Sequence, residues 1–239
     1  MLKAIFFDLG DTLIFSFPSK EELFRQAACE AGLDIGLKAI KIAYLIVNFQ
    51  NKYSSIKIFD SKDKEDFYRK YNEELCKALG ISTHFERIYN ILKPKFKYQR
   101  KWKLEKGARW ILENLYQQGV TLALIANWDK AISLLLEQLR IKKFFSLIIS
   151  SQMIGVEKPN PEIFYYALDK LSFSAKDGRI LYVGNEYEID VLGSRKAGLE
   201  PILIDKDKIY LHADCARFDS LIKWYKSLKI FTSIIKNQE

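Results

Sequence analysis

Four polar clusters in this sequence have residue types that suit chemistry on an anionic group. They are Asp8, Asn127, Lys158 and the run Gly184–Asp190. A free carboxylate such as Asp8 can attack phosphorus or carbon to form a covalent intermediate, which divides one hard step into two. An ammonium group held beside it can offset the repulsion between this nucleophile and an anionic substrate. A catalytic aspartate at position 8 is therefore one interpretation of the pattern.

Each cluster also has a purely structural interpretation. Asp8 could cap a turn, and Asn127 could cap the helix that follows it. Lys158 could be an exposed lysine in a loop stiffened by Pro159 and Pro161. Alternatively, the Asn127 amide and nearby backbone N–H groups could bind a phosphoryl oxygen. The predicted helices and strands around these residues are needed to choose between the structural and the catalytic roles.

The C-terminal part of the chain alternates between helical and strand patterns. An apolar run ends at Asp8, and periodicity predicts a series of further elements: helices near 105–118, 132–139, 161–171, 189–197 and 218–230, and strands near 120–125, 144–149, 179–183 and 201–204. Such repeats predict an α/β fold with a Rossmann-like parallel sheet and helices on both faces. Because the carboxyl ends of parallel strands share one edge, we expect the four clusters to meet there.

Residues 15–95 carry helical patterns and no strand pattern. We expect helices near 19–31, 37–49, 61–79 and 85–92, the first capped by Ser19. The first strand is thereby separated from its sheet partners. The prediction is a core of residues 1–15 and 97–239 with an inserted, all-helical cap of residues 16–96.

The four clusters resemble the four sequence motifs of the haloacid dehalogenase (HAD) superfamily, which is dominated by phosphatases. The inserted helices resemble the C1-type cap of that family. The resemblance implies a phosphatase acting on a small phosphorylated molecule, with Asp8 as nucleophile and an aspartyl-phosphate intermediate. It implies that Lys158 and the segment Ala126–Asn127 hold the phosphoryl group.

The resemblance also implies Mg²⁺, held by Asp8, the Gly10 carbonyl and Asn185, with Asp190 behind them. Phosphatases of this family usually place an acidic residue where Asn185 stands. An amide oxygen can ligate Mg²⁺ but brings no charge, so we expect weakened metal binding. Glu186 could supply the missing charge if the turn directs it inward.

Two further positions depart from the phosphatase pattern. Gly10 replaces a second aspartate that acts as general acid, and Ala126 replaces a Ser or Thr. Asp11 is the candidate substitute acid, although on an extended strand it would point to the opposite side. Without a general acid, substrates with good leaving groups are favoured, such as acyl or aryl phosphates.

Two alternatives stay open. One is a metal-independent 2-haloacid dehalogenase. It would need an arginine and an apolar surface around the halide from the cap, and Arg25 is one candidate for the arginine. The other is a catalytically weak binding or regulatory protein that keeps the fold, motivated by Gly10, Ala126 and Asn185. The sequence does not select the substrate or the oligomeric state.

The amino-acid composition limits which classes of protein the chain can belong to. The 239 residues are 49% hydrophobic and carry a formal charge of +8, with no run of 18 apolar residues and no signal-peptide pattern. We expect a cytoplasmic protein with no membrane span. The three cysteines, Cys29, Cys76 and Cys215, are predicted to be small core residues. The basic, aromatic segment 93–103 is predicted to be a solvated connection, so a nucleic-acid partner is not expected.

Overall fold

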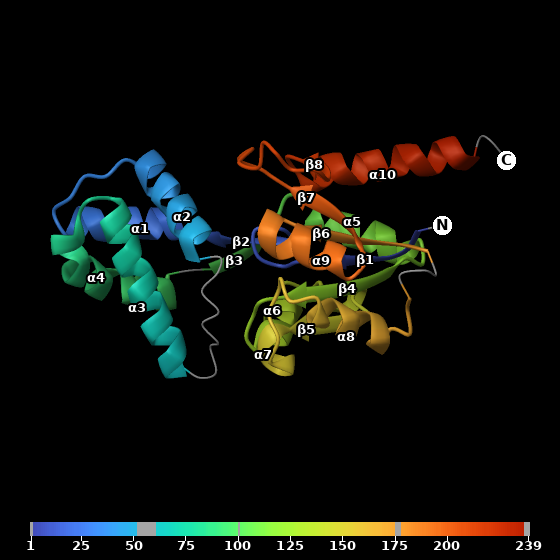
Figure 1. Ribbon diagram of the computed structural model, residues 1–239, viewed down its shortest axis with the longest axis horizontal. Coiled ribbons are helices and arrows are strands. Elements are labelled where there is room, and N and C mark those ends of the chain that lie inside the picture. The colour runs from blue at the N-terminus through green and yellow to red at the C-terminus, as the bar shows by residue number, and fades with distance from the viewer. Residues whose placement is uncertain (1, 52–60, 100, 175–177, 237–239) are drawn as a thin grey trace. The chain divides into compact units, whose positions relative to one another are not determined.

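The structure is a computed structural model that describes residues 2–51, 61–99, 101–174 and 178–236 (Figure 1). Its contacts divide the chain into two compact units. The core unit comprises Met1–Phe15 and Lys103–Glu239, and the helical unit comprises Ser16–Trp102. The helical unit is thus inserted after the first strand of the core.

The core unit is built on a six-stranded parallel sheet in the order β5-β4-β1-β6-β7-β8. The strands are β1 (Leu2–Phe7), β4 (Thr121–Ala126), β5 (Leu147–Ser150), β6 (Arg179–Gly184), β7 (Glu200–Ile204) and β8 (Ala216–Phe218). The predicted α/β, Rossmann-like fold class is confirmed. The short edge strand β8 was not predicted.

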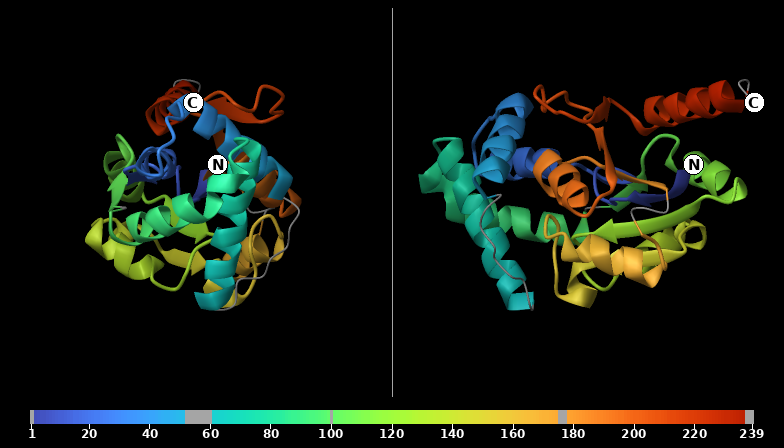
Figure 2. Two further views of the ribbon diagram at one scale, coloured as in Figure 1. Left: turned by 90° about the vertical axis from the view of Figure 1, so that its left-hand side faces the viewer. Right: turned by 45° about the vertical axis from the view of Figure 1, so that its right-hand side comes forward.

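Helices cover both faces of this sheet (Figures 1 and 2). On one face, α8 (Glu162–Lys170) contributes Phe164 and Ala167 to a buried cluster that includes Phe6 and Tyr182 from the sheet. On the other face lie α5 (Ala108–Gln117) and α10 (Leu221–Lys236), and the Trp224 ring meets Phe7 edge to face at 5.7 Å. Side chains that alternate along β1 therefore pack into two separate layers, as its continuous apolar run requires.

The ends of the three central strands position the polar clusters. Strand β1 pairs with β4 through Phe7 and Leu124, and with β6 through Phe7 and Val183. Because these strands are parallel and in register, the residues after Phe7, Ala126 and Gly184 emerge at one edge. The sheet thereby brings together segments that are more than a hundred residues apart in the chain.

Several core elements differ from the sequence-based expectation. The helix predicted at 189–197 is a π-helical turn, Tyr187–Val191, followed by the short α9 (Leu192–Lys196). The strand predicted at 144–149 begins only at Leu147, after a 3₁₀ turn at Lys142–Phe144. A short helix, α7 (Ser151–Ile154), follows that strand, and α6 (Ile132–Gln138) lies where a helix was expected.

The helical unit has a hydrophobic core of its own. Its helices are α1 (Lys20–Glu30), α2 (Leu37–Asn51), α3 (Ser61–Ala78) and α4 (Phe85–Tyr98), with a 3₁₀ turn at Ser82–His84. Buried side chains such as Phe24, Val47 and Leu92 form one cluster. Ser19 caps α1 in a reciprocal pair with Glu22, as predicted.

Most described side chains of the segment 93–103 are exposed, as predicted, but the segment is formed by the end of a helix and a strand, and it is not a connection between elements. Helix α4 continues through Pro94 to Tyr98, so the predicted boundary at residues 96 and 97 falls inside a helix. The segment then forms β3 (Lys101–Leu104), which pairs with β2 (Ile14–Phe17) in a two-stranded sheet. Phe96 packs on the helical core, and Lys95 pairs with Glu30 at 2.7 Å. Packing of this amphipathic helix outweighs the helix-breaking tendency of Pro94.

Two composition-based expectations can be compared with the structure. Cys76 is buried, but Cys29 is exposed and Cys215 is half-buried, so the prediction of three core cysteines is wrong for two of them. Within the described ranges, no helix has the length and apolar character needed to cross a bilayer.

Candidate active site

Asp8 lies at the centre of the polar edge of the sheet. It is the first residue after β1, and its backbone N–H donates to the Val183 carbonyl at 2.9 Å, so the chain is still held by β6 at this point. The carboxylate is on the same sheet face as Phe6, because side chains two residues apart share a face. Only 10% of the Asp8 side chain is exposed.

Lys158 connects the two buried carboxylates of the site. Its Nζ donates to Asp8 Oδ1 at 2.7 Å, to Asp190 Oδ1 at 2.7 Å and to the Tyr182 hydroxyl at 2.9 Å. The Lys158 side chain is 2% exposed. It is therefore a buried member of the site and not an exposed loop lysine.

Burial and charge set the protonation of this cluster. Burial raises the pKa of Asp8 to about 6, because the lowering effect of the Lys158 charge does not fully compensate for desolvation and the nearby Asp190. Burial by itself would lower the pKa of Lys158, but Asp190 and Asp8 raise it well above the usual value. Lys158 therefore stays protonated, and Asp8 is predominantly ionised at neutral pH.

Asp190 is fixed from both of its oxygens. Oδ2 accepts the backbone N–H groups of Asn185 and Glu186 at 3.0 and 2.9 Å, while Oδ1 accepts from Lys158. Gly184 makes this arrangement possible: a Cβ built at that position would lie 2.4 Å from Asp190 Cγ. The carboxylate thus holds the turn after β6 and the ammonium of Lys158, which leaves it poorly placed to ligate a metal directly.

Asn127 holds the backbone of Lys158. Its Nδ2 donates to the Lys158 carbonyl at 2.9 Å, and its Oδ1 accepts the Lys158 N–H at 2.8 Å. Two residues further on, Asn160 Oδ1 accepts the Glu162 N–H at 3.1 Å and fixes the start of α8. The Asn127 side chain therefore positions the lysine loop, and it does not cap the next helix.

Apart from the carboxylates of Asp8 and Asp190, the oxygen donors that the sequence predicts for Mg²⁺ are uncharged. Gly10 offers its carbonyl, and Asn185 offers Oδ1, which already accepts a 3.2 Å hydrogen bond from the buried Thr12 hydroxyl. Among the described residues, no group of three or more His, Cys, Asp or Glu side chains could hold a metal ion. A carboxylate, an amide oxygen and a carbonyl oxygen are donor types that Mg²⁺ accepts, so Asp8, Asn185 and Gly10 fit a site with few charged donors.

The other predicted site residues lie around this centre. Asp11 is exposed and has a left-handed backbone with φ of 56°, so it is part of a turn and not of an extended strand. Ala126 is the buried last residue of β4. Burial raises the pKa of Tyr210, and the charges of Glu186 and Glu188 raise it further. Arg25 is exposed on α1 of the helical unit.

Trp128 borders the position that lacks the second carboxylate. A Cβ built at Gly10 would lie 3.4 Å from a carbon of the Trp128 ring, which is ordinary van der Waals contact. This side of the site is therefore lined by an aromatic ring and a glycine.

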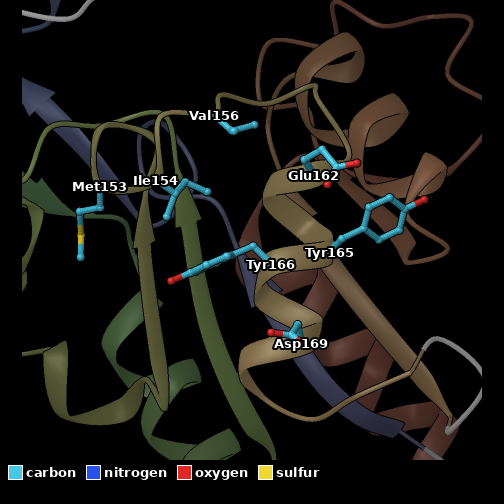
Figure 3. A pocket seen from close by; sticks show the side chains of 7 residues that line it. All are labelled: Met153, Ile154, Val156, Glu162, Tyr165, Tyr166 and Asp169. Atoms are coloured by element: carbon cyan, nitrogen blue, oxygen red, sulfur yellow. The ribbon is translucent and has the colours of Figure 1, made fainter.

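A surface groove of about 530 Å³ lies beside α7 and α8 (Figure 3). It is lined by Met153, Ile154, Val156, Glu162, Tyr165, Tyr166 and Asp169. Tyr165 donates its hydroxyl proton to the Lys196 carbonyl at 3.0 Å, so this ring links α8 to α9. None of the predicted site residues lines the groove.

Two residues of the site were not identified from the sequence. Tyr182 lies within the apolar strand β6, where a tyrosine is typical of core packing, and Thr12 lies in the turn after Asp8. A polar side chain two residues before the glycine that ends a strand was the available signal for Tyr182. Its direction became evident only when the sheet was assembled.

The fold and the site together define an α/β protein with an aspartate nucleophile candidate held by a buried lysine at the carboxyl edge of a parallel sheet. The chain belongs to the haloacid dehalogenase-like hydrolase family, whose sequence profile matches residues 5–204.

Two similar proteins and one solved structure illustrate the resemblance. A glyceraldehyde 3-phosphate phosphatase of Pyrococcus abyssi is 31% identical, with 84% of this chain and 81% of that protein covered. One from Methanothermobacter thermautotrophicus is 28% identical over 87% of each chain. The crystal structure of a predicted phosphoglycolate phosphatase from Haemophilus somnus shares the fold, with a TM-score of 0.64 at 21% identity over 96% of this chain and 98% of the other.

Proposed function

We propose that this protein is a phosphatase that transfers the phosphoryl group of a small phosphorylated molecule to Asp8 and then to water. The observation that carries the proposal is the buried Lys158 ammonium, which lies 2.7 Å from both Asp8 and Asp190. A hydrolase that attacks an anionic group with a carboxylate needs such a fixed positive charge. The similarity to proteins named glyceraldehyde 3-phosphate phosphatase supports a small phosphorylated substrate.

The chain's residues divide the reaction into two steps. In the first, an oxygen of Asp8 forms a bond to phosphorus while the bond from phosphorus to the leaving oxygen breaks. In the second, water attacks the aspartyl phosphate and releases inorganic phosphate and the Asp8 carboxylate. Lys158 holds Asp8 in place and offsets negative charge on the phosphoryl oxygens, while Asn127 holds the backbone of Lys158.

The leaving oxygen has no donor at position 10. Gly10 has no side chain, and the exposed Asp11 makes no side-chain hydrogen bond or ion pair within the described residues. We therefore infer that substrates whose leaving oxygen is stable as an anion, such as acyl or aryl phosphates, are turned over fastest.

Mg²⁺ belongs to the same proposal. Asp8, the Gly10 carbonyl and Asn185 would hold it, with Asp190 acting through the lysine and the turn. When bound, the ion would neutralise part of the charge on the phosphoryl group. Its affinity should be low, because a carboxylate is missing at Asn185.

The helical unit Ser16–Trp102 is proposed to be the cap of the enzyme. A cap that closes over a site excludes water and selects substrates that fit beneath it. This role would account for a small substrate. A cytoplasmic location, expected from the composition, also stays a prediction.

The test measures phosphate release from acetyl phosphate, p-nitrophenyl phosphate and glyceraldehyde 3-phosphate, with Mg²⁺ and with EDTA. Wild type should turn over at least one of them, and Asp8→Asn should not. An Asp8-dependent release of halide from a 2-haloacid would instead identify a dehalogenase. An intact fold with no turnover of any of these compounds would refute the phosphatase and favour a binding or regulatory protein.

A further inference from the structure

Tyr182 carries a hydroxyl into the centre of the site from within the sheet. It is a residue of β6 and is completely buried. Its hydroxyl lies 3.0 Å from the Ile125 carbonyl of β4, although β1 runs between β6 and β4 in the sheet. The side chain therefore crosses the strand that leads to Asp8.

A count of protons shows what this hydroxyl does. An ammonium group has three protons, and Lys158 Nζ has three acceptors: Asp8, Asp190 and the Tyr182 oxygen. The hydroxyl has one proton, which it can give to the Ile125 carbonyl or to Asp190 Oδ1 at 3.2 Å. Burial raises the pKa of Tyr182 well above its usual value, so the proton is retained.

We propose that Tyr182 is a positioning residue for Lys158. Its hydroxyl oxygen accepts a hydrogen bond from the third N–H of the ammonium and fixes Nζ between Asp8 and Asp190. For its effect on turnover, the proposal rests on the proposed phosphatase function. The geometric part concerns the ammonium alone. It can therefore be measured in the absence of any substrate.

The proposal has a specific consequence during the reaction. When Asp8 attacks phosphorus, the attacking oxygen loses negative charge and Asp8 becomes a weaker partner for the ammonium. Asp190 and Tyr182 are the two remaining acceptors of Lys158, and Tyr182 is anchored in turn to the backbone of β4. Two acceptors fix the direction of the Nζ protons, whereas one acceptor would allow the ammonium to move away.

The test compares Tyr182→Phe with a matched variant, Tyr225→Phe. Phenylalanine at 182 removes only the hydroxyl and keeps the ring that packs edge to face on Phe164 at 5.0 Å. Tyr225 is equally buried, on α10 at the opposite face, and its hydroxyl accepts from Gln118 at 3.3 Å. Both variants lose one buried hydroxyl, but only the first should affect the lysine.

The first readout is the Lys158 ammonium signal in ¹H–¹⁵N NMR, assigned by its loss in Lys158→Arg. A buried ammonium with three acceptors exchanges its protons slowly, so wild type and Tyr225→Phe should show the signal. Tyr182→Phe should lose most of it. An unchanged signal in a folded Tyr182→Phe protein would overturn the proposal.

The second readout is turnover of acetyl phosphate. Tyr182→Phe should lower kcat about tenfold with KM within about twofold of wild type, as expected when one hydrogen bond to a charged group is lost. Equal kcat in Tyr182→Phe and Tyr225→Phe would contradict the proposal. If wild type has no turnover but Tyr182→Phe still loses the ammonium signal, the positioning role is upheld and the phosphatase is refuted.

A rescue variant covers the case in which Tyr182→Phe does not fold. 4-Aminophenylalanine at position 182 replaces the hydroxyl by an amino group. Its nitrogen can also accept a hydrogen bond from Lys158, and its N–H can donate one to the Ile125 carbonyl. This protein should keep the ammonium signal and more of the kcat than the phenylalanine variant. A folded rescue protein without the signal would count against the proposal.

Discussion

Lys158 Nζ lies 2.7 Å from Asp8 Oδ1, although 150 positions separate the two residues in the chain. The same ammonium also pairs with Asp190, so two buried carboxylates share one positive charge. The cluster therefore has a net charge of −1 when all three groups are ionised. Its stability and its chemistry both depend on this balance.

Asp8→Asn should stabilise the folded protein at neutral pH. The pKa of Asp8 is raised from 3.8 to about 6, so the folded state binds the proton more tightly than the unfolded state does. Wild-type stability should accordingly fall as pH rises from about 4 to 6, by about 2–3 kcal/mol. The asparagine variant lacks this loss, and urea denaturation at pH 4 and pH 7 measures it.

The control for this prediction is Asp34→Asn, which changes an exposed aspartate of the helical unit. It should leave the difference in unfolding free energy between pH 4 and pH 7 unchanged. If Asp8→Asn shows the same pH dependence as wild type, Asp8 is not the group that is protonated in this range.

Lys158→Met should destabilise the protein and abolish most activity. Removing one partner of a buried ion pair typically costs about 3–5 kcal/mol, because the remaining charges are left unpaired. The loss should be smaller at pH 4, where Asp8 is protonated. Turnover should fall by at least about a hundredfold, as for loss of a group that stabilises the transition state.

Lys142→Met is the matched control, since Lys142 pairs with Glu137 at the surface at 2.6 Å. This change should alter the free energy of unfolding by less than about 1 kcal/mol. Adding Asp8→Asn to Lys158→Met should restore part of the lost stability. Strictly additive effects of the two changes would show that the charges do not interact.

Asn185→Asp should tighten Mg²⁺ binding about tenfold or more, because a second carboxylate would join Asp8 among the oxygen donors. The Thr12 hydroxyl can still donate to the new side chain. Isothermal titration with Mg²⁺ measures the affinity without any substrate. Asn114→Asp on α5 makes the same charge change away from the site and should leave the affinity unaltered. Equal affinity in the two variants would exclude Asn185 as a ligand.

Gly184→Ala should impair both folding and turnover. The added Cβ would lie 2.4 Å from Asp190 Cγ, so Asp190 would have to leave the N–H groups of the turn and the Lys158 ammonium. A cost of about 1–3 kcal/mol or more is expected from overpacking. Gly36→Ala in the helical unit meets nothing within 4 Å and should be close to neutral. Thermal unfolding with phosphate-release kinetics tests both variants.

The sequence by itself determined the fold class and where chemistry would occur. The apolar run before Asp8 indicates a buried strand, and the alternation of helices and strands after residue 105 predicts a parallel sheet. Parallel strands must end at one edge, so the proximity of Asp8, Asn127 and the run that begins at Gly184 followed from topology alone. Lys158 lies beyond β5 and α7, so its contact with Asp8 did not follow from topology. Patterns of this kind need no knowledge of side-chain direction, which is why they could be interpreted.

The tertiary structure alone decided what each polar side chain contacts. Asn127 bonds to the Lys158 backbone, Asp190 serves the lysine and the turn, and Tyr182 reaches across β1. Helix α4 likewise passes through Pro94 because its apolar side packs on the helical core. Hydrogen-bond partners depend on distances of a few ångströms between segments that are distant in the chain. Those distances are set by the assembled sheet, and local sequence patterns do not specify them.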